Sequence, residues 1–120
     1  MPSASEPPRW PMRKLTIDTD FKDDAVVLRL TGDLDFASFG LLDAPLQTLQ
    51  MDGRSDLVID LSDVGFIDST GLRVLLQAHR RALARGRTLL IRGASVQAMQ
   101  LFRLTGAEGE LTIEELGTAS

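Results

Sequence analysis

Cysteine is absent from this 120-residue chain, and so is any run of apolar residues long enough to cross a membrane. The lack of cysteine excludes a disulfide framework and a thiolate metal site, although it is compatible with several compartments. A membrane-spanning helix needs about 20 apolar residues, so neither a span nor a signal peptide is present. We therefore expect a cytoplasmic protein that does not enter a membrane.

Positive charge is also scarce, since the chain has 13 basic and 17 acidic residues and a net charge of -4. Binding to nucleic acid or to an anionic bilayer requires clustered positive charge. The basic residues gather at Arg73, Arg80, Arg81, Arg85 and Arg87. No aromatic residue is interleaved with them to stack on bases, so a solvated helix face explains them better. We expect protein partners, with no nucleic acid and no membrane.

The single histidine argues against catalysis by a nucleophilic serine. Around Ser69 the G-x-S-x-G pattern of serine esterases fails, because Ile67 stands where its first glycine belongs. His79 lies about 15 Å further along a predicted helix, beyond hydrogen-bond reach of Ser69. We interpret it as a partly buried histidine with satisfied polar atoms. Since a Walker-type phosphate loop is missing as well, we expect no enzyme activity.

Three aspartates near Ser69 raise the question of a cation site. They are Asp60, Asp63 and Asp68, and their spacing lacks the glycine and the distal glutamate of a calcium loop. Carboxylates that flank strand ends commonly serve as solvated caps. We therefore expect neither a metal nor a cofactor.

The chain divides into a leader, residues 1–13, and a single domain, residues 14–117. The leader has no apolar periodicity and carries several prolines, which favours a flexible segment. Trp10 is its exception, because it either folds back onto the domain or presents an exposed contact. A chain of this length buries roughly two thirds of its unfolded surface around one core.

Strands and helices alternate along the domain after an initial hairpin. Apolar patterning predicts strands at 15–18, 25–30, 57–61, 88–92 and 110–114. The first two strands form the hairpin through residues 22–24, and helices separate the later ones. This order predicts an α/β fold in which helices pack against a mixed, mostly parallel sheet through right-handed crossovers.

Three helices are predicted from their end signals and apolar stripes. The start and stop residues are Ser38 and Gly53, Thr70 and Gly86, and Ser95 and Gly106. The stripes are Leu42, Leu46 and Leu49; Leu72, Leu75, Leu76, His79 and Leu83; and Val96, Met99 and Phe102. Pro45 lies within the first helix and either kinks it or delays its start.

The segment Asp63–Leu72 places hydroxyl groups where a strand-to-helix connection begins a helix. Unpaired N–H groups and the positive end of the dipole make that position favourable for negative charge. A phosphate on Ser69 would be tolerated there, and with Asp68 beside it the surface would become strongly acidic. The alternative, from spacing alone, is that residues 68–70 simply cap the helix while Gly71 allows close packing.

Three segments in register resemble the STAS domain, the fold of bacterial anti-sigma factor antagonists. They are Leu30-Thr31-Gly32-Asp33-Leu34-Asp35, residues 60–71, and residues 95–106 with their glycine stop. The first is similar to the Gly-x-Leu-Asp segment of the family. The second contains Ser69, which corresponds to the serine that follows an aspartate in the family and is phosphorylated there. The resemblance covers most of residues 15–114 and implies the STAS fold.

The resemblance also implies a function. The unphosphorylated antagonist binds an anti-sigma factor that is itself a serine kinase, which frees the sigma factor. Phosphorylation of Ser69 by that kinase ends the interaction, and a serine phosphatase restores it. The docking residues that the resemblance implies are Gly32, Asp33, Leu34, Asp35, Asp68, Ser69, Thr70, Gly71, Leu72 and Arg73.

Two departures from the family pattern bear on this expectation. Arg73 stands where antagonists often carry a second glycine, so its cation either softens the repulsion by a phosphate or selects a different kinase. Residues 115–120 are too few for the terminal helix of many relatives, and we expect a monomer or a weak dimer. An alternative role is that of a non-catalytic STAS scaffold subunit in a stress-sensing or lipid-transport complex.

Overall fold

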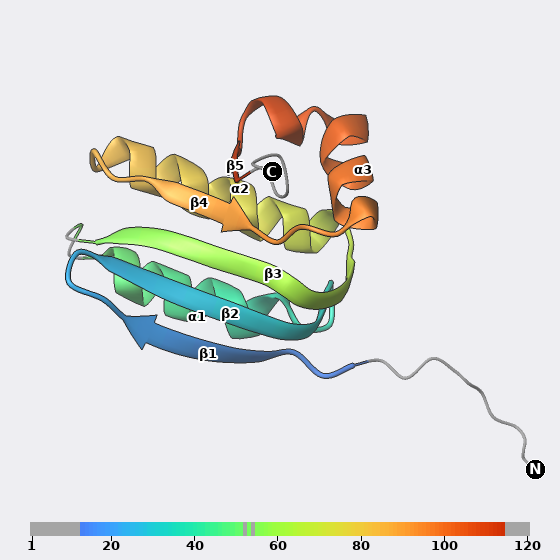
Figure 1. Ribbon diagram of the computed structural model, residues 1–120, viewed down its shortest axis with the longest axis horizontal. Coiled ribbons are helices and arrows are strands. Elements are labelled where there is room, and N and C mark those ends of the chain that lie inside the picture. The colour runs from blue at the N-terminus through green and yellow to red at the C-terminus, as the bar shows by residue number, and fades with distance from the viewer. Residues whose placement is uncertain (1–12, 52, 54, 115–120) are drawn as a thin grey trace, which may run out of the picture.

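The computed structural model describes residues 13–51, 53 and 55–114, which form a five-stranded sheet and three α-helices. The elements are β1 (Thr16–Phe21), β2 (Ala25–Leu34), α1 (Phe39–Gln50), β3 (Asp56–Ile67), α2 (Ser69–Ala84), β4 (Leu89–Arg92), α3 (Val96–Thr105), the 3₁₀ turn η1 (Ala107–Gly109) and β5 (Thr112–Ile113). The sheet order is β1-β2-β3-β4-β5 (Figure 1). Only the β1–β2 pair is antiparallel among these described strands, so the predicted mixed, mostly parallel sheet is confirmed.

The strand β3 is much longer than the predicted strand at 57–61. It pairs in parallel with β2 as far as Ile67, opposite Leu34, and at two register shifts on the way β3 carries one extra residue. The length of β3 could not be predicted from the sequence, because the apolar run ends at Leu61 and is followed by polar residues and a glycine. The consequence is that α2 starts directly at the end of a paired strand instead of after a loop.

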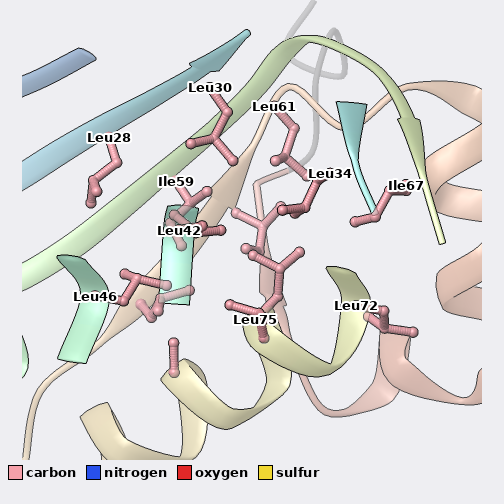
Figure 2. Packing of buried hydrophobic residues seen from close by; sticks show 14 of the residues in the cluster. Leu28, Leu30, Leu34, Leu42, Leu46, Ile59, Leu61, Ile67, Leu72 and Leu75 are labelled. Atoms are coloured by element: carbon pink, nitrogen blue, oxygen red, sulfur yellow. The ribbon is translucent and has the colours of Figure 1, made fainter. Parts of the chain in front are cut away.

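The helices α1 and α2 lie behind the sheet in the view of Figure 1 and pack against each other. Each crossover from β2 onward moves one strand further in the same direction, and right-handed crossovers then place their helices on one face. Figure 2 shows side chains of β2 and β3 meeting those of α1 and α2. The largest fully buried side chains include Phe102, Leu28, Leu30, Leu34, Leu42, Leu46, Ile59, Leu61, Leu75, Leu89 and Ile91. Phe102 joins α3 to this core.

Two residues of the predicted apolar stripes point to solvent. Leu83 is 58% exposed and Val96 is 72% exposed, so their assignment to the core was wrong. In α2 the buried side instead includes Ala78 and Ala82, whose small side chains let the helix approach the sheet. Val96 is the first residue of α3 and lies beside the cap, where the helix has not yet turned toward the core.

The first helix begins in a different way from its prediction. Ser38 occupies the N-cap position, but its hydroxyl does not accept a hydrogen bond from the helix. It donates to the Asp33 carbonyl at 2.7 Å and accepts from the Asp35 N–H at 3.0 Å. The turn that leaves β2 therefore uses this hydroxyl, and the predicted side-chain cap is wrong. Pro45 lies inside α1, which nevertheless starts at Phe39.

The ends of α3 match their prediction. The Ala98 N–H donates to Ser95 Oγ at 3.0 Å, which is the expected N-cap. Gly106 ends the helix with a φ of 82°, a left-handed conformation that favours glycine. Both ends could be predicted because each depends on one residue acting on neighbouring backbone.

A row of alternating charges crosses the sheet on the face opposite α1 and α2. Arg29 lies 4.0 Å from Asp18 on one side and 3.9 Å from Asp60 on the other, and Arg92 lies 3.2 Å from Glu114. Asp18, Arg29, Asp60 and Arg92 stand at the same register position of four successive strands. Exposed pairs of this kind each contribute little to stability.

Asp60 is the most buried carboxylate of that row, with 13% of its side chain exposed. Burial alone would raise its pKa. The hydrogen bonds from the Ser62 hydroxyl and N–H, with the charges of Arg92 and Arg29, outweigh burial and lower the pKa of Asp60 below its ordinary value. Folding therefore favours the ionised form of this side chain.

The predicted leader falls outside the described residues except for Arg13, and so does Trp10. Arg13, which we had assigned to the leader, contacts the domain. Its backbone N–H donates to Asp33 Oδ2 and its guanidinium to the Asp63 carbonyl, both at 3.2 Å. Residues 115–117 of the predicted domain are also outside the described part. Within the described residues, no helix is both long and apolar enough to cross a membrane.

Candidate functional site

The carboxyl ends of β2 and β3 lie side by side, because these strands are parallel and Leu34 is in register with Ile67. Residues 35–38 lead from β2 into α1, while Asp68 alone separates β3 from α2. Binding sites in open α/β sheets gather at this edge. The two predicted docking segments, 32–35 and 68–73, therefore lie close together.

Asp68 holds the two connections together. It is the N-cap of α2, and its Oδ1 accepts the Gly71 N–H at 3.0 Å. Its Oδ2 accepts the Phe36 N–H at 3.1 Å, from the connection before α1. One carboxylate thus caps a helix and fixes the neighbouring loop, and charge-assisted hydrogen bonds of this kind are stronger than neutral ones.

Ser69 is the first residue of α2 and its side chain is exposed. Because Asp68 supplies the cap, the Ser69 hydroxyl makes no hydrogen bond to any residue that the structure describes. In the alternative interpretation, residues 68–70 cap the helix. Asp68 does cap it, but Ser69 does not. The hydroxyl is therefore accessible to another molecule.

Several predicted docking residues have buried side chains. Gly32, Leu34, Gly71 and Leu72 are all buried, and Figure 2 shows Leu34 and Leu72 within the core. A Cβ on Gly32 would lie 2.7 Å from the carbonyl carbon of Lys14, so only glycine fits there. These side chains pack beneath the edge of the sheet, and a role of these residues in docking stays a prediction.

The two aspartates of the Gly-x-Leu-Asp segment make internal hydrogen bonds. Asp33 accepts the Arg13 N–H with its side chain and donates its own N–H to the Arg13 carbonyl at 3.0 Å. Asp35 Oδ1 accepts from the N–H groups of Ala37 and Ser38 at 3.0 and 3.1 Å. Asp35 therefore stabilises the connection between β2 and α1, as an Asx turn does, while Asp33 ties the segment before β1 to the end of β2.

Two exposed aromatic residues beside Ser69 were missed by the sequence analysis. Phe36 is 75% exposed in the connection before α1, and Phe66 is 53% exposed near the end of β3. Exposed aromatic residues are enriched among the side chains that dominate protein–protein binding. Strand alternation gave no clear signal for Phe66, because after Leu61 the strand β3 has two exposed residues between successive buried ones.

Two hollows lie near the strand-to-helix connection that carries Ser69. One, of about 280 Å³, lies between the starts of α1 and α2 and is lined by Phe36, Phe39 and Arg73 among others. The other, of about 230 Å³, lies between the end of β3 and the start of α3 and is lined by Phe66 and Ser95 among others. The edge that carries the Ser69 hydroxyl thus has two hollows near it, one lined by Phe36 and the other by Phe66.

The chemistry available to Ser69 is that of an unactivated hydroxyl. His79 is 4% exposed, and its Nδ1 has no hydrogen-bond partner among the described residues, so the expected satisfied histidine was wrong. Ten residues along the helix place it about 15 Å from Ser69. The described residues contain no group of three or more side chains suited to hold a metal ion.

A family model described as "Mlab, STAS domain" matches residues 17–115. The chain belongs to the STAS domain family. The "Anti-sigma-B factor antagonist" of Staphylococcus aureus is 28% identical to this STAS domain over 101 residues, covering 84% of this chain and 94% of the relative.

Solved structures agree on the fold of this STAS domain. An anti-sigma factor antagonist from Mycobacterium paratuberculosis superposes with a TM-score of 0.77 at 21% identity, covering 87% of this chain and 88% of the other. The Bacillus cell fate determinant SpoIIAA in its phosphorylated form gives 0.67 at 20% identity, covering 87% and 96%. The family and the fold class expected from the sequence are confirmed.

Proposed function

We propose that this STAS domain is an anti-sigma factor antagonist that docks on an anti-sigma factor serine kinase until Ser69 is phosphorylated. The observation that carries the proposal is the exposed Ser69 hydroxyl at the first residue of α2, left unbonded by the described residues because Asp68 caps the helix. The name of the Staphylococcus aureus relative supports the same function.

The chemical step is phosphoryl transfer, and the kinase supplies its machinery. The Ser69 oxygen forms a bond to the γ-phosphorus of ATP while the bond to ADP breaks, and a base of the kinase takes the hydroxyl proton. This domain contributes an accessible nucleophile on a rigid helix start. A serine phosphatase hydrolyses the phosphate ester with water and returns the hydroxyl.

The switch works by charge on a surface that otherwise keeps its shape. A phosphate adds about 1.5 to 2 negative charges at neutral pH. It would stand beside the Asp68 carboxylate, although the start of α2 tolerates anions. A partner surface that fits the bare hydroxyl then meets bulk and like charge, which costs several kcal/mol of binding free energy. Phe36 and Phe66 supply the apolar contacts around it.

The proposal is tested by locating the phosphate after incubation with an anti-sigma factor kinase and ATP. Mass spectrometry should find it on Ser69, and Ser69→Ala should abolish labelling. Ser62→Ala is the matched control, because Ser62 is also exposed but its hydroxyl is held by Asp60 at 2.6 Å. Label on Thr70 alone, or none at all, would reject the proposal.

The alternative, a non-catalytic scaffold subunit of a stress-sensing or lipid-transport complex, uses the same edge without a modified hydroxyl. The description of the matching family model, which names Mlab, keeps this alternative open. The switch predicts that Ser69→Ala retains binding to the kinase and that Ser69→Glu weakens it. Equal affinities of these variants would favour the scaffold.

A further inference from the structure

The hollow between the starts of α1 and α2 has an aromatic wall beside Ser69. Phe36 and Phe39 line it, with ring centroids 6.2 Å apart and planes inclined by 35°. Phe36 is held in place through its N–H by Asp68. Thr70 lines the same hollow, so the depression begins one residue after the proposed phosphorylation site.

One cation in this hollow has no ion-pair partner among the residues that the structure describes. Asp43 is also part of the lining, but its carboxylate lies 4.0 Å from Arg81 and accepts a hydrogen bond from Gln47 at 2.9 Å. Arg73 is exposed, and no described residue forms an ion pair with it. The hollow therefore offers an apolar wall and a free guanidinium, which complement an apolar side chain next to a carboxylate.

Arg73 also stands one helical turn after Ser69. Side chains four residues apart on a helix face each other, with about 5–6 Å between their Cβ atoms. An anion that precedes a cation in this spacing is the favourable order. A phosphate on Ser69 would thus come within reach of the Arg73 guanidinium, and phosphate is a group that arginine binds with two parallel hydrogen bonds.

We propose that Arg73 has two alternating partners, and this inference rests on the proposed function. In the unmodified protein it pairs with a carboxylate on the segment of the anti-sigma factor kinase that places an apolar side chain against Phe36 and Phe39. In the phosphorylated protein it pairs with the phosphate on Ser69. Phosphorylation then removes the cation that the kinase recognises in addition to placing negative charge on the docking edge.

This mechanism differs from simple repulsion in its effect on binding. If Arg73 only softened the charge of the phosphate, removing it would weaken docking further in the phosphorylated protein. If the phosphate withdraws Arg73 from the partner, removing it costs affinity only while Ser69 is bare. Simple repulsion thus predicts that Arg73→Gln costs more affinity in the phosphorylated protein, whereas withdrawal of Arg73 predicts that it costs more in the unmodified protein.

The intramolecular half is tested without any partner. Phosphoserine is incorporated at position 69 by genetic encoding in the wild-type chain, in Arg73→Gln, and in Arg103→Gln as a control for net charge. Arg103 is a suitable control because it is exposed and already paired with Glu108. Phosphorus NMR against pH should give a second phosphate pKa lower by about half a unit in wild type than in Arg73→Gln. Equal titrations of wild type and Arg73→Gln would overturn the ion pair.

The partner half uses calorimetry with the anti-sigma factor kinase that phosphorylates Ser69. Arg73→Gln should weaken binding of the unmodified protein by about five- to thirty-fold, while Arg103→Gln leaves it within about two-fold. With phosphoserine at 69, Arg73→Gln should change the affinity by less than about two-fold. A further loss in the phosphorylated form, or no loss in the unmodified form, would overturn the inference. A kinase that binds no form of the protein counts against the proposed function, while the titration still decides the ion pair.

Discussion

Replacing Gly71 by alanine should disturb the start of α2, on which the whole site depends. A Cβ at this position would lie 2.8 Å from Leu34 Cγ and 3.1 Å from Ile67 Cγ1, and closer still to the Leu34 carbonyl oxygen. Optimal contacts between carbon atoms are about 3.5 to 4.0 Å. Because the nearest atom belongs to the backbone of β2, the helix start itself has to move away from the sheet.

The magnitude follows from two opposing effects. Overpacking a well-packed region costs about 1 to 3 kcal/mol, and a clash with backbone belongs at the upper end of that range. Alanine is favoured over glycine in a helix by about 1 kcal/mol. We therefore expect Gly71→Ala to lower the free energy of unfolding by about 2 kcal/mol. The same movement lengthens the hydrogen bonds that the Gly71 and Phe36 N–H groups donate to the Asp68 carboxylate.

Urea unfolding followed by circular dichroism measures this change directly. Gly40→Ala is the matched control, because Gly40 lies in α1 and an added Cβ there would meet nothing within 4 Å. That control should be more stable than wild type by up to about 1 kcal/mol. If Gly71→Ala is at least as stable as wild type, the close approach of α2 to β2 does not constrain the site as we describe.

Three further predictions concern stability. Asp68→Ala should lower the free energy of unfolding by about 1 to 2 kcal/mol, because it loses the cap of α2 and the contact with the connection before α1. An unchanged urea midpoint would contradict the stabilising role of these two hydrogen bonds. Phe102→Ala should lower the free energy of unfolding by about 3 to 5 kcal/mol in the same assay. Phe36→Ala, at a 75% exposed position, should change it by no more than about 0.5 kcal/mol. Similar losses in the two variants would contradict the burial of Phe102 and the exposure of Phe36. Folding lowers the pKa of Asp60 below its ordinary value. The ionised Asp60 side chain therefore stabilises the folded protein at a pH above the ordinary pKa, and this stabilisation is lost as the pH falls through the lowered pKa of the folded state. In Asp60→Asn the free energy of unfolding should therefore fall less steeply below about pH 4 than in wild type. The same decline in both proteins would contradict the lowered pKa of Asp60.

The parts of the fold that could be predicted are those that depend on neighbouring residues. Ser95 and Gly106 mark the ends of α3 because a cap and a left-handed glycine act within one turn. The length of β3 could not be predicted, because parallel pairing with β2 carries it past Leu61 through polar residues. Leu83 was misplaced because the face that α2 buries is set by the sheet and not by hydrophobicity alone.

The candidate site divides in the same way. Its position could be predicted, because a serine at a strand-to-helix connection is visible in the sequence together with the family segments. The second hydrogen bond of Asp68 could not, since it joins residues far apart in the chain, Phe36 and Asp68. The burial of Leu34 and the exposure of Phe36 could not be predicted either, because both follow from tertiary packing.

The central claim is that the bare Ser69 hydroxyl admits the kinase and that a phosphate on it excludes the kinase. Reconstitution tests this most directly, with a complex of the anti-sigma factor kinase and its sigma factor to which unmodified or phosphoserine-bearing protein is added. Sigma factor released from the complex is measured by size-exclusion chromatography. We expect release by the unmodified protein and none by the phosphorylated one. Equal release by both forms, or release by neither, would contradict the account.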